Sequence, residues 1–250
     1  NSMNTVTAKL IKDLGTERVI KLAHALGIES NIPNVPTIAL GAAELKLKEM
    51  VAANASLVNS GVYIEPTFVV RVEDRYGNTI YEPTPEIRQG LDELTAYRVI
   101  RMMQGVVDGA WNEELQKRNG TAIRLRYDSK QRDYDGIKAP MAGKTGTTQN
   151  NTDGWFMGLT PELVTGVWVG AHDPTIRFSS TTYGQGANTA LPIYGFFMKD
   201  TYADEGIALS KEEFTRPEEL GADTLNCKEQ ASLKGHTFDS DGFDDSDLFN

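Results

Sequence analysis

The stretch 142-AGKTGTTQNNTDGWFMGLTPELVTGVWVGA-171 replaces the helical spacing of the preceding chain with alternating apolar and polar residues and frequent glycine. It predicts three strands, at residues 142–148, 154–159 and 164–171, which are separated by short polar connections. Connections of this length make neighbouring strands antiparallel. We therefore expect a small antiparallel sheet, across which a helix predicted at residues 191–202 can lie.

Upstream of this sheet, apolar residues recur at helical spacing and turn residues separate the segments. Helices are predicted at residues 5–14, 16–26, 43–60 and 94–107, with Thr16 as the cap of the second, and a hairpin at residues 67–82 around Tyr76-Gly77-Asn78. The polar stretch 108–135 reads as an exposed excursion, although residues 121–125 could be ordered. The pattern predicts one α+β domain, an antiparallel sheet flanked by helices, over residues 1–203, followed by a flexible acidic tail at 204–250.

The amino-acid composition and charge argue against several classes of function. The net charge of −10 comes mostly from the end of the chain, since residues 204–250 hold 13 acids and 4 bases while the rest holds 22 and 21. A nearly neutral body argues against binding to nucleic acid or to an anionic membrane face. One cysteine and three scattered histidines disfavour a structural metal site, and we expect none. No apolar run approaches the roughly 18 residues that span a bilayer.

The segment Gly143-Lys144-Thr145-Gly146 allows two chemical interpretations. A phosphate-binding loop needs glycine at position 138, which is lysine, and needs a following helix, whereas a strand is predicted. The alternative is a strand that binds a carboxylate through the charge of Lys144 and the hydroxyls of Thr145 and Thr147. The Thr147 N–H would then stabilise an oxyanion, a contribution of about 3 kcal/mol. K-T-G alone is equally consistent with a structural strand that carries a solvated lysine.

The longer string K-T-G-T-T, with Asp153-Gly154-Trp155-Phe156 and Val167-Trp168-Val169-Gly170 after it, resembles the transpeptidase domain of class A penicillin-binding proteins. The resemblance extends over most of residues 1–203, and Ser2-Met3-Asn4 matches the family's S-x-N motif, which by itself could equally be a helix cap. It implies the penicillin-binding-protein and serine β-lactamase-like fold. It also implies a D,D-transpeptidase that cross-links peptidoglycan stem peptides through a serine acyl-enzyme, binds β-lactams and needs no cofactor.

The resemblance assigns roles to particular residues. Ser2 relays a proton to the leaving group and the Asn4 amide holds the peptide carbonyl of the substrate. Lys144 and Thr145 bind the terminal carboxylate, Gly146 lets the substrate backbone approach, and Thr147 holds the oxyanion. The candidate catalytic residues are thus Ser2, Asn4, Lys144 and Thr147, and the candidate substrate-binding residues are Lys144, Thr145, Gly146 and Thr147.

The nucleophile of the family is missing from the sequence. No serine is followed three residues later by lysine, so the S-x-x-K motif is absent. We expect a fragment that is inactive alone, with the nucleophile, a glycosyltransferase domain and a membrane anchor upstream, in an extracytoplasmic protein that works with the cell-wall synthesis machinery. The alternatives are a D,D-carboxypeptidase, a serine β-lactamase and a non-catalytic penicillin-recognising sensor.

Overall fold

The centre of the molecule is a three-stranded antiparallel sheet. The computed structural model describes residues 2–112, 116–127 and 132–218. The strand order is β7-β8-β9, with β7 at Ala142–Thr147, β8 at Asp153–Leu159 and β9 at Val164–Gly170. Both neighbouring pairs are antiparallel, which confirms the prediction from the short connections and the α+β fold class.

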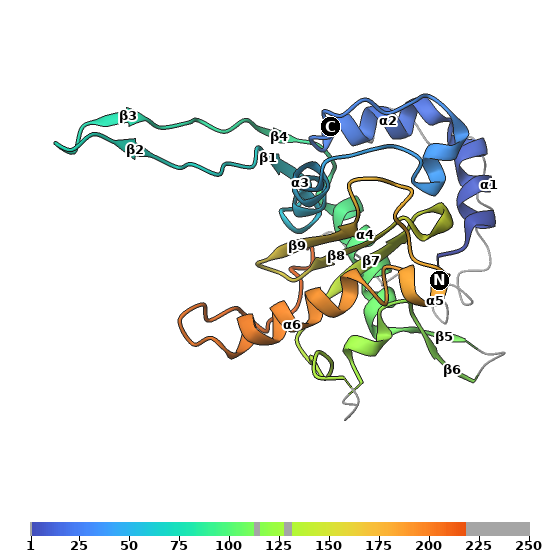
Figure 1. The fold of residues 1–250 in the computed structure, drawn as a ribbon. Helices are drawn as coiled ribbons and strands as arrows, with labels where there is room; N and C mark the ends of the chain where they lie inside the picture. Colours follow the sequence, from blue (N-terminus) through green and yellow to red (C-terminus); the bar gives the residue numbers. More distant parts are fainter. Residues whose placement is uncertain (1, 113–115, 128–131, 219–250) are drawn as a thin grey trace.

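Helices pack on both faces of this sheet (Figure 1). They are α3 at Leu47–Val58, α4 at Glu93–Asp108 and α6 at Ala190–Ala203. Two glycines show which helix lies on which face. A Cβ at Gly166 would stand 2.7 Å from the side chain of Val51 in α3, and a Cβ at Gly158 would stand 2.2 Å from the ring of Tyr194 in α6. The predicted helix across the sheet is therefore confirmed as α6.

The interior divides into two hydrophobic clusters, one for each face. On the α6 face, the rings of Phe156 and Tyr194 pack with their centroids 4.8 Å apart. On the α3 and α4 face, Leu57, Ile100 and Leu159 form the buried cluster. Because successive side chains of a strand point to opposite faces, β8 contributes to both clusters. The sheet is thus clamped from both sides, which holds β7 in place.

The N-terminal segment forms α1 at Asn4–Leu14, α2 at Thr16–Ala25 and the short 3₁₀ helix η1 at Pro36–Leu40. The predicted helices are confirmed, but two details differ. Thr16 is the first residue of α2 and Gly15 takes the cap position, so the predicted cap is wrong by one residue. The third helix, α3, begins at Leu47, four residues later than predicted, after an extended Lys46.

The predicted hairpin is a long two-stranded arm that extends away from the body (Figure 1). Its base is formed by β1 at Val62–Ile64 with β4 at Ile87–Gln89, and its tip by β2 at Val72–Glu73 with β3 at Thr79–Tyr81. At the turn, the Asp74 carboxylate accepts hydrogen bonds from the N–H groups of Tyr76 and Asn78, at 2.8 and 2.9 Å. A side chain that bonds its own backbone two residues on is the usual device of such turns.

The stretch predicted as an exposed excursion is partly core. It contains β5 at Ala110–Asn112, β6 at Lys117–Asn119 and η2 at Ile123–Leu125. Ala122 and Leu125 are completely buried in the cluster on the α6 face. The expectation that residues 121–125 could be ordered is confirmed by η2, whereas the expected exposure of the stretch was wrong. The segment contains few apolar residues and lacks a regular period, yet these few are buried in the core.

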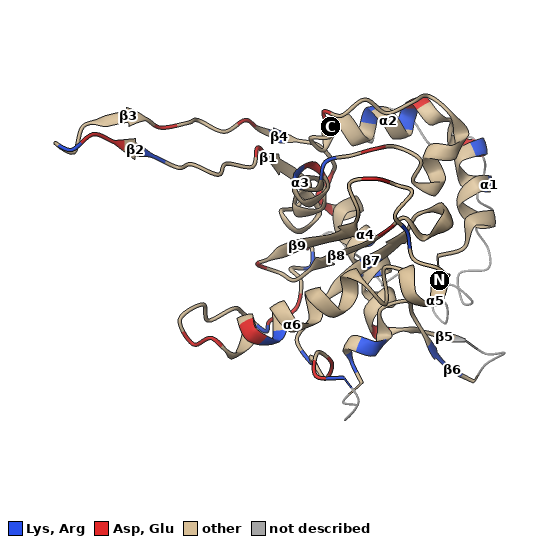
Figure 2. Ribbon diagram, in the orientation of Figure 1, with Lys and Arg blue, Asp and Glu red and all other residues tan. Residues whose placement is uncertain are grey.

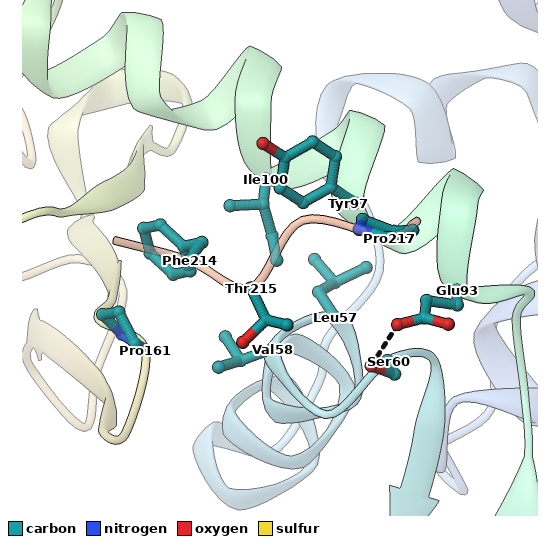
Figure 3. A pocket seen from close by; sticks show the side chains of 10 residues that line it. All are labelled: Leu57, Val58, Ser60, Glu93, Tyr97, Ile100, Pro161, Phe214, Thr215 and Pro217. Carbon is teal, nitrogen blue, oxygen red and sulfur yellow. Dashed lines mark hydrogen bonds between the residues drawn. The ribbon is translucent and has the colours of Figure 1, made fainter. Parts of the chain in front are cut away.

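The chain after α6 stays on the domain. The short helix α5 at Thr181–Gly184 precedes α6. After α6 the chain continues to Phe214, which is 7% exposed and belongs to the buried cluster on the α3 and α4 face. Figure 3 shows Phe214, Thr215 and Pro217 crossing between α3 and α4, where they line a pocket. The predicted boundary at residue 203 therefore excludes a core side chain. The rest of the predicted tail, 219–250, lies outside the described residues.

Candidate active site

The residue Lys144 lies in the middle of β7, on the outer strand of the sheet. It pairs with Met157 of β8, and its neighbour Thr145 pairs with Phe156. Side chains alternate along a strand, so Lys144 and Thr145 point to opposite faces. This separation matters because the sequence interpretation had assigned both to one carboxylate.

Ser2 and Lys144 are brought together by the fold. The Lys144 ammonium donates hydrogen bonds to Ser2 Oγ at 3.0 Å and to the Thr145 carbonyl oxygen at 2.5 Å. The Ser2 hydroxyl does not cap α1, because Met3 occupies the cap position and makes no side-chain hydrogen bond there. The interpretation of S-x-N as a helix cap is therefore wrong for this chain. The serine is instead turned towards β7.

Desolvation shapes the electrostatics of Lys144. The surrounding chain lowers the pKa of the Lys144 ammonium through burial, although part of the side chain still reaches solvent. A lysine in such a place loses its proton at lower pH than a free lysine. Within the described residues, no group of three or more His, Cys, Asp or Glu side chains lies close enough to hold a metal ion. The functional groups gathered around Lys144 are its own charge, the Ser2 hydroxyl and the backbone carbonyl of Thr145.

Thr145 has a structural position. Its hydroxyl is buried and donates a hydrogen bond to Thr121 Oγ1 at 2.8 Å. This bond ties Thr145 to the turn after β6. The role of the Thr145 hydroxyl in carboxylate binding stays a prediction.

Thr147 ends β7 with both its hydroxyl and its amide accessible. The Thr148 N–H donates to the Asp153 carbonyl at 3.2 Å, so that pair is a hydrogen-bonded one of the antiparallel ladder. Residue pairs that exchange backbone hydrogen bonds alternate along an antiparallel ladder with pairs that do not. The pair of Thr147 and Gly154 is therefore one without these bonds. Its N–H points to the outer edge of β7, away from β8. The Thr147 hydroxyl oxygen accepts a hydrogen bond from the Gly186 N–H at 3.1 Å.

The two glycines of the motif serve packing within the sheet. A Cβ at Gly143 would lie 2.8 Å from the Phe156 ring and 2.9 Å from the Met157 carbonyl oxygen. A Cβ at Gly146 would lie 3.0 Å from the Cβ of Trp155. Tight neighbours inside the sheet thus account for both glycines, while the approach of a substrate to Gly146 stays a prediction.

Asn4, the fourth candidate, is the first residue of α1 and is exposed beside Ser2. Three residues that the sequence interpretation missed join the site: Thr121 from the turn after β6, Arg124 from η2, which follows that turn, and Gly186 from the loop before α6. No spacing rule links them to K-T-G, since they contact β7 or its neighbours only in the folded chain. The pocket in Figure 3 includes none of the candidate residues and lies elsewhere, between α3 and α4.

The charge pattern around the site is mixed. Figure 2 shows Lys and Arg interspersed with Asp and Glu over the ribbon of the described residues. Within β7 the only charged residue is Lys144.

Comparison with known proteins identifies the family. The family model described as "Penicillin binding protein transpeptidase domain" matches residues 1–186. The chain belongs to this family. The resemblance inferred from K-T-G-T-T and Ser2-Met3-Asn4 is thus confirmed.

Relatives within the transpeptidase family agree with this assignment. Penicillin-binding protein 2D of Bacillus subtilis is 34% identical over 204 residues, which cover 82% of this chain and 27% of that protein. Penicillin-binding protein 1A of Rickettsia prowazekii is 28% identical and is covered to 26% of its length. The chain therefore spans about a quarter of the length of these curated relatives.

Solved structures of penicillin-binding proteins share the fold. Penicillin-binding protein 1A from Haemophilus influenzae superimposes with a TM-score of 0.72 at 20% identity, over 88% of this chain and 35% of that one. PonA1 from Mycobacterium tuberculosis has a TM-score of 0.67 at 26% identity, over 88% of this chain and 57% of that one. The predicted penicillin-binding-protein fold is thereby confirmed.

Proposed function

We propose that this chain forms the proton-relay and carboxylate-binding side of the active site of a serine D,D-transpeptidase that cross-links peptidoglycan stem peptides. The observation that carries the proposal is the 3.0 Å contact between Lys144 Nζ and Ser2 Oγ, two residues 142 positions apart. The family's two motifs, S-x-N and K-T-G, meet at this contact. A strand with a solvated lysine would not need it.

The contact gives each group a defined role. Because the Lys144 ammonium donates to Ser2 Oγ, the hydrogen of the Ser2 hydroxyl is free to be donated onward. In the proposed reaction it goes to the nitrogen of the leaving D-alanine, or to the ring nitrogen of a β-lactam. Lys144 then restores the proton of Ser2. A lowered pKa suits this relay, since a lysine that gives up its proton more readily is the better acid.

The serine nucleophile is proposed to come from a part of the protein beyond these 250 residues, which contain no S-x-x-K motif. Its oxygen forms a bond to the penultimate carbonyl carbon, its hydroxyl proton replaces the one that Lys144 gave to Ser2, and the carbon–nitrogen bond to the terminal D-alanine breaks. An amine of a neighbouring stem peptide then forms a bond to the same carbon and displaces the serine oxygen, which takes up the proton that the amine loses. This sequence balances without a metal or an organic cofactor.

The outer edge of β7 provides the groups that hold the substrate. The Thr147 N–H points to this edge and can donate to the developing oxyanion. The side chains of Lys144 and Thr147 leave β7 on opposite faces, and in the proposal the Lys144 charge and the Thr147 hydroxyl both reach the terminal carboxylate at this edge. The Asn4 amide, which is exposed beside Ser2, is proposed to hold a peptide carbonyl. Thr145 is proposed to bind the same terminal carboxylate, and its hydroxyl also donates to Thr121 Oγ1.

The wider setting is part of the same proposal. Substrates are stem peptides ending in D-Ala-D-Ala, and β-lactams imitate them; PonA1 of Mycobacterium tuberculosis has been solved in complex with penicillin V. The protein would work on the extracytoplasmic side, together with the cell-wall synthesis machinery and with a glycosyltransferase domain and membrane anchor of the same protein. In the described residues, no helix combines the length and the apolar character that a membrane crossing requires.

The test is acylation of the full-length protein by a fluorescent penicillin, combined with a donor stem peptide and an amine acceptor. A penicillin adduct together with a cross-linked peptide product supports the proposal. Release of D-alanine without cross-linking indicates a carboxypeptidase, rapid penicillin hydrolysis a β-lactamase, and an adduct without any peptide product a sensor. Absence of both an adduct and penicillin hydrolysis with the folded full-length protein would refute all four.

A double-mutant cycle tests the decisive contact. Ser2→Ala, Lys144→Ala and the double variant are compared by their rates of acylation, because groups that act as a pair lose less together than the sum of their separate losses. We expect strong coupling between the two substitutions. Independent effects that multiply would show that the contact has no part in acylation.

A further inference from the structure

The loop before α6 is locked against the end of β7. The Gly186 N–H of this loop donates a hydrogen bond to Thr147 Oγ1. The backbone of the loop also lies directly against β7 and β8. A Cβ at Gly186 would lie 2.3 Å from the Gly146 carbonyl oxygen and 2.4 Å from that of Trp155. No side chain fits between Gly186 and these two strands, so a shift of the loop would also move Thr147.

Arg124 holds this loop from the other side. Its Nη1 donates to the Ala187 carbonyl oxygen at 3.1 Å and also to Asn188 Oδ1, 63 and 64 residues further along the chain. The Asn188 amide in turn donates to the Thr182 carbonyl, which ties the same loop to α5. A guanidinium bound to two acceptors on consecutive residues restricts both the position and the tilt of the loop.

The same turn also holds the middle of β7. Thr121, three residues before Arg124, bonds to the Thr145 hydroxyl at 2.8 Å. The turn after β6 is therefore connected to β7 at Thr145 directly and at Thr147 through the loop. It is anchored in turn by Ala122 and Leu125, which are completely buried.

The orientation of the Thr147 hydroxyl follows from these contacts. A hydroxyl oxygen that accepts from Gly186 N–H has its own hydrogen directed elsewhere, free to donate to an acceptor at the open edge of the sheet. We propose that Arg124 is a positioning residue: through Ala187 and Gly186 it keeps the Thr147 hydroxyl oriented as a donor to the carboxylate of the substrate. The inference rests on the proposed function and adds to it a determinant of substrate selectivity outside the motifs.

The experiment compares two ligands that differ only in this carboxylate. Full-length protein is acylated by benzylpenicillin and by its neutral methyl ester, and the ratio of the two second-order rate constants measures how strongly the site prefers the carboxylate. In Arg124→Gln we expect this ratio to fall about tenfold, the factor that a hydrogen bond to a charged group typically contributes. The concentration for half-maximal acylation by benzylpenicillin should rise while the limiting rate is retained.

Matched variants separate positioning from general damage. Arg118→Gln removes a guanidinium of the same region that donates to the Gly109 carbonyl at 2.8 Å and not to the loop, so the ratio should stay unchanged. Arg124→Lys, which keeps one donor, should recover part of the ratio. Should Arg124→Gln not fold, Asn188→Ala decides, because it removes one acceptor of Arg124 from the partly exposed loop, and we expect a smaller fall in the same direction.

The outcomes are distinct. An equal fall for both ligands, or an unchanged ratio in Arg124→Gln and Asn188→Ala, would overturn the inference and leave the proposed function standing. A wild-type protein that reacts with neither ligand would overturn the proposed function and, with it, this inference.

Discussion

Removing the side chain of Phe214 tests whether the chain beyond α6 belongs to the domain. A buried phenylalanine removes about 150–250 Å² from water, and at about 25 cal/mol per Å² this stabilises the fold by roughly 4–6 kcal/mol. Phe214 is 7% exposed, so nearly all of this applies. The unfolded chain already buries part of such a surface, which reduces the contribution. We therefore expect Phe214→Ala to lower the free energy of unfolding by about 3–4 kcal/mol, within the usual range for such changes.

The assay is urea unfolding of the chain, followed by the fluorescence of Trp155 and Trp168, which face each other across β8 and β9. Total stabilities of about 5–15 kcal/mol make a loss of this size easy to measure, and the melting temperature should fall by roughly 6–15 °C. The matched control is Phe68→Ala, because Phe68 is 82% exposed on the hairpin arm and should contribute less than about 0.5 kcal/mol.

Equal stabilities of Phe214→Ala and Phe68→Ala would refute the reasoning. They would mean that the segment crossing between α3 and α4 contributes nothing to the core, and that the domain ends at residue 203, as the helical pattern alone predicted.

The remaining predictions concern the site and the sheet. Lys144→Ala in the full-length protein should slow acylation by benzylpenicillin about 10- to 100-fold through weaker carboxylate binding, and an unchanged rate would contradict the role given to that charge. Because burial lowers the pKa of Lys144, acylation should decline on the alkaline side below the ordinary lysine value of about 10.4, and Lys144→Arg should remove this decline, as a pH profile of both proteins would show. Gly158→Ala should cost about 1–3 kcal/mol, since its Cβ would lie 2.2 Å from the Tyr194 ring, whereas Gly105→Ala, with open space around it, should cost nothing in the same urea experiment. The 250-residue chain alone should acquire no penicillin adduct, and a stable adduct in its mass spectrum would show that a nucleophile has been overlooked.

Much of the secondary structure was predicted from local sequence patterns. Helices at α1, α4 and α6, the hairpin with its Asp74 turn and the three strands around K-T-G all follow from spacing and turn residues, which act over a few positions. Errors occurred where a distant contact overrides a local pattern. Ala122 and Leu125 are apolar residues in a mostly polar segment, and Phe214 lies beyond the last regular helix. The side chains of all three are nevertheless buried in the core.

The residues of the candidate site also differ in whether a local motif or a distant contact defines their place. Lys144, Thr147 and Ser2-Met3-Asn4 were identified from motifs, and the family match bears out the family but leaves their individual roles to experiment. Thr145 was assigned to the terminal carboxylate from its hydroxyl and from the family resemblance, and this role stays a prediction. Strand alternation turns Thr145 to the face opposite Lys144, where the Thr121 hydroxyl holds it.

The sequence by itself determined the family, the strands and the presence of Lys144 on one of them, because motifs and periodicity depend on residues close together in the chain. Only the tertiary structure decided that Lys144 meets Ser2 across 142 positions, and that Arg124 reaches Thr147 through the loop at Gly186. The physical reason is that hydrogen bonds act over about 3 Å whatever the separation in sequence. Packing of the two clusters against the sheet brings these groups within that distance.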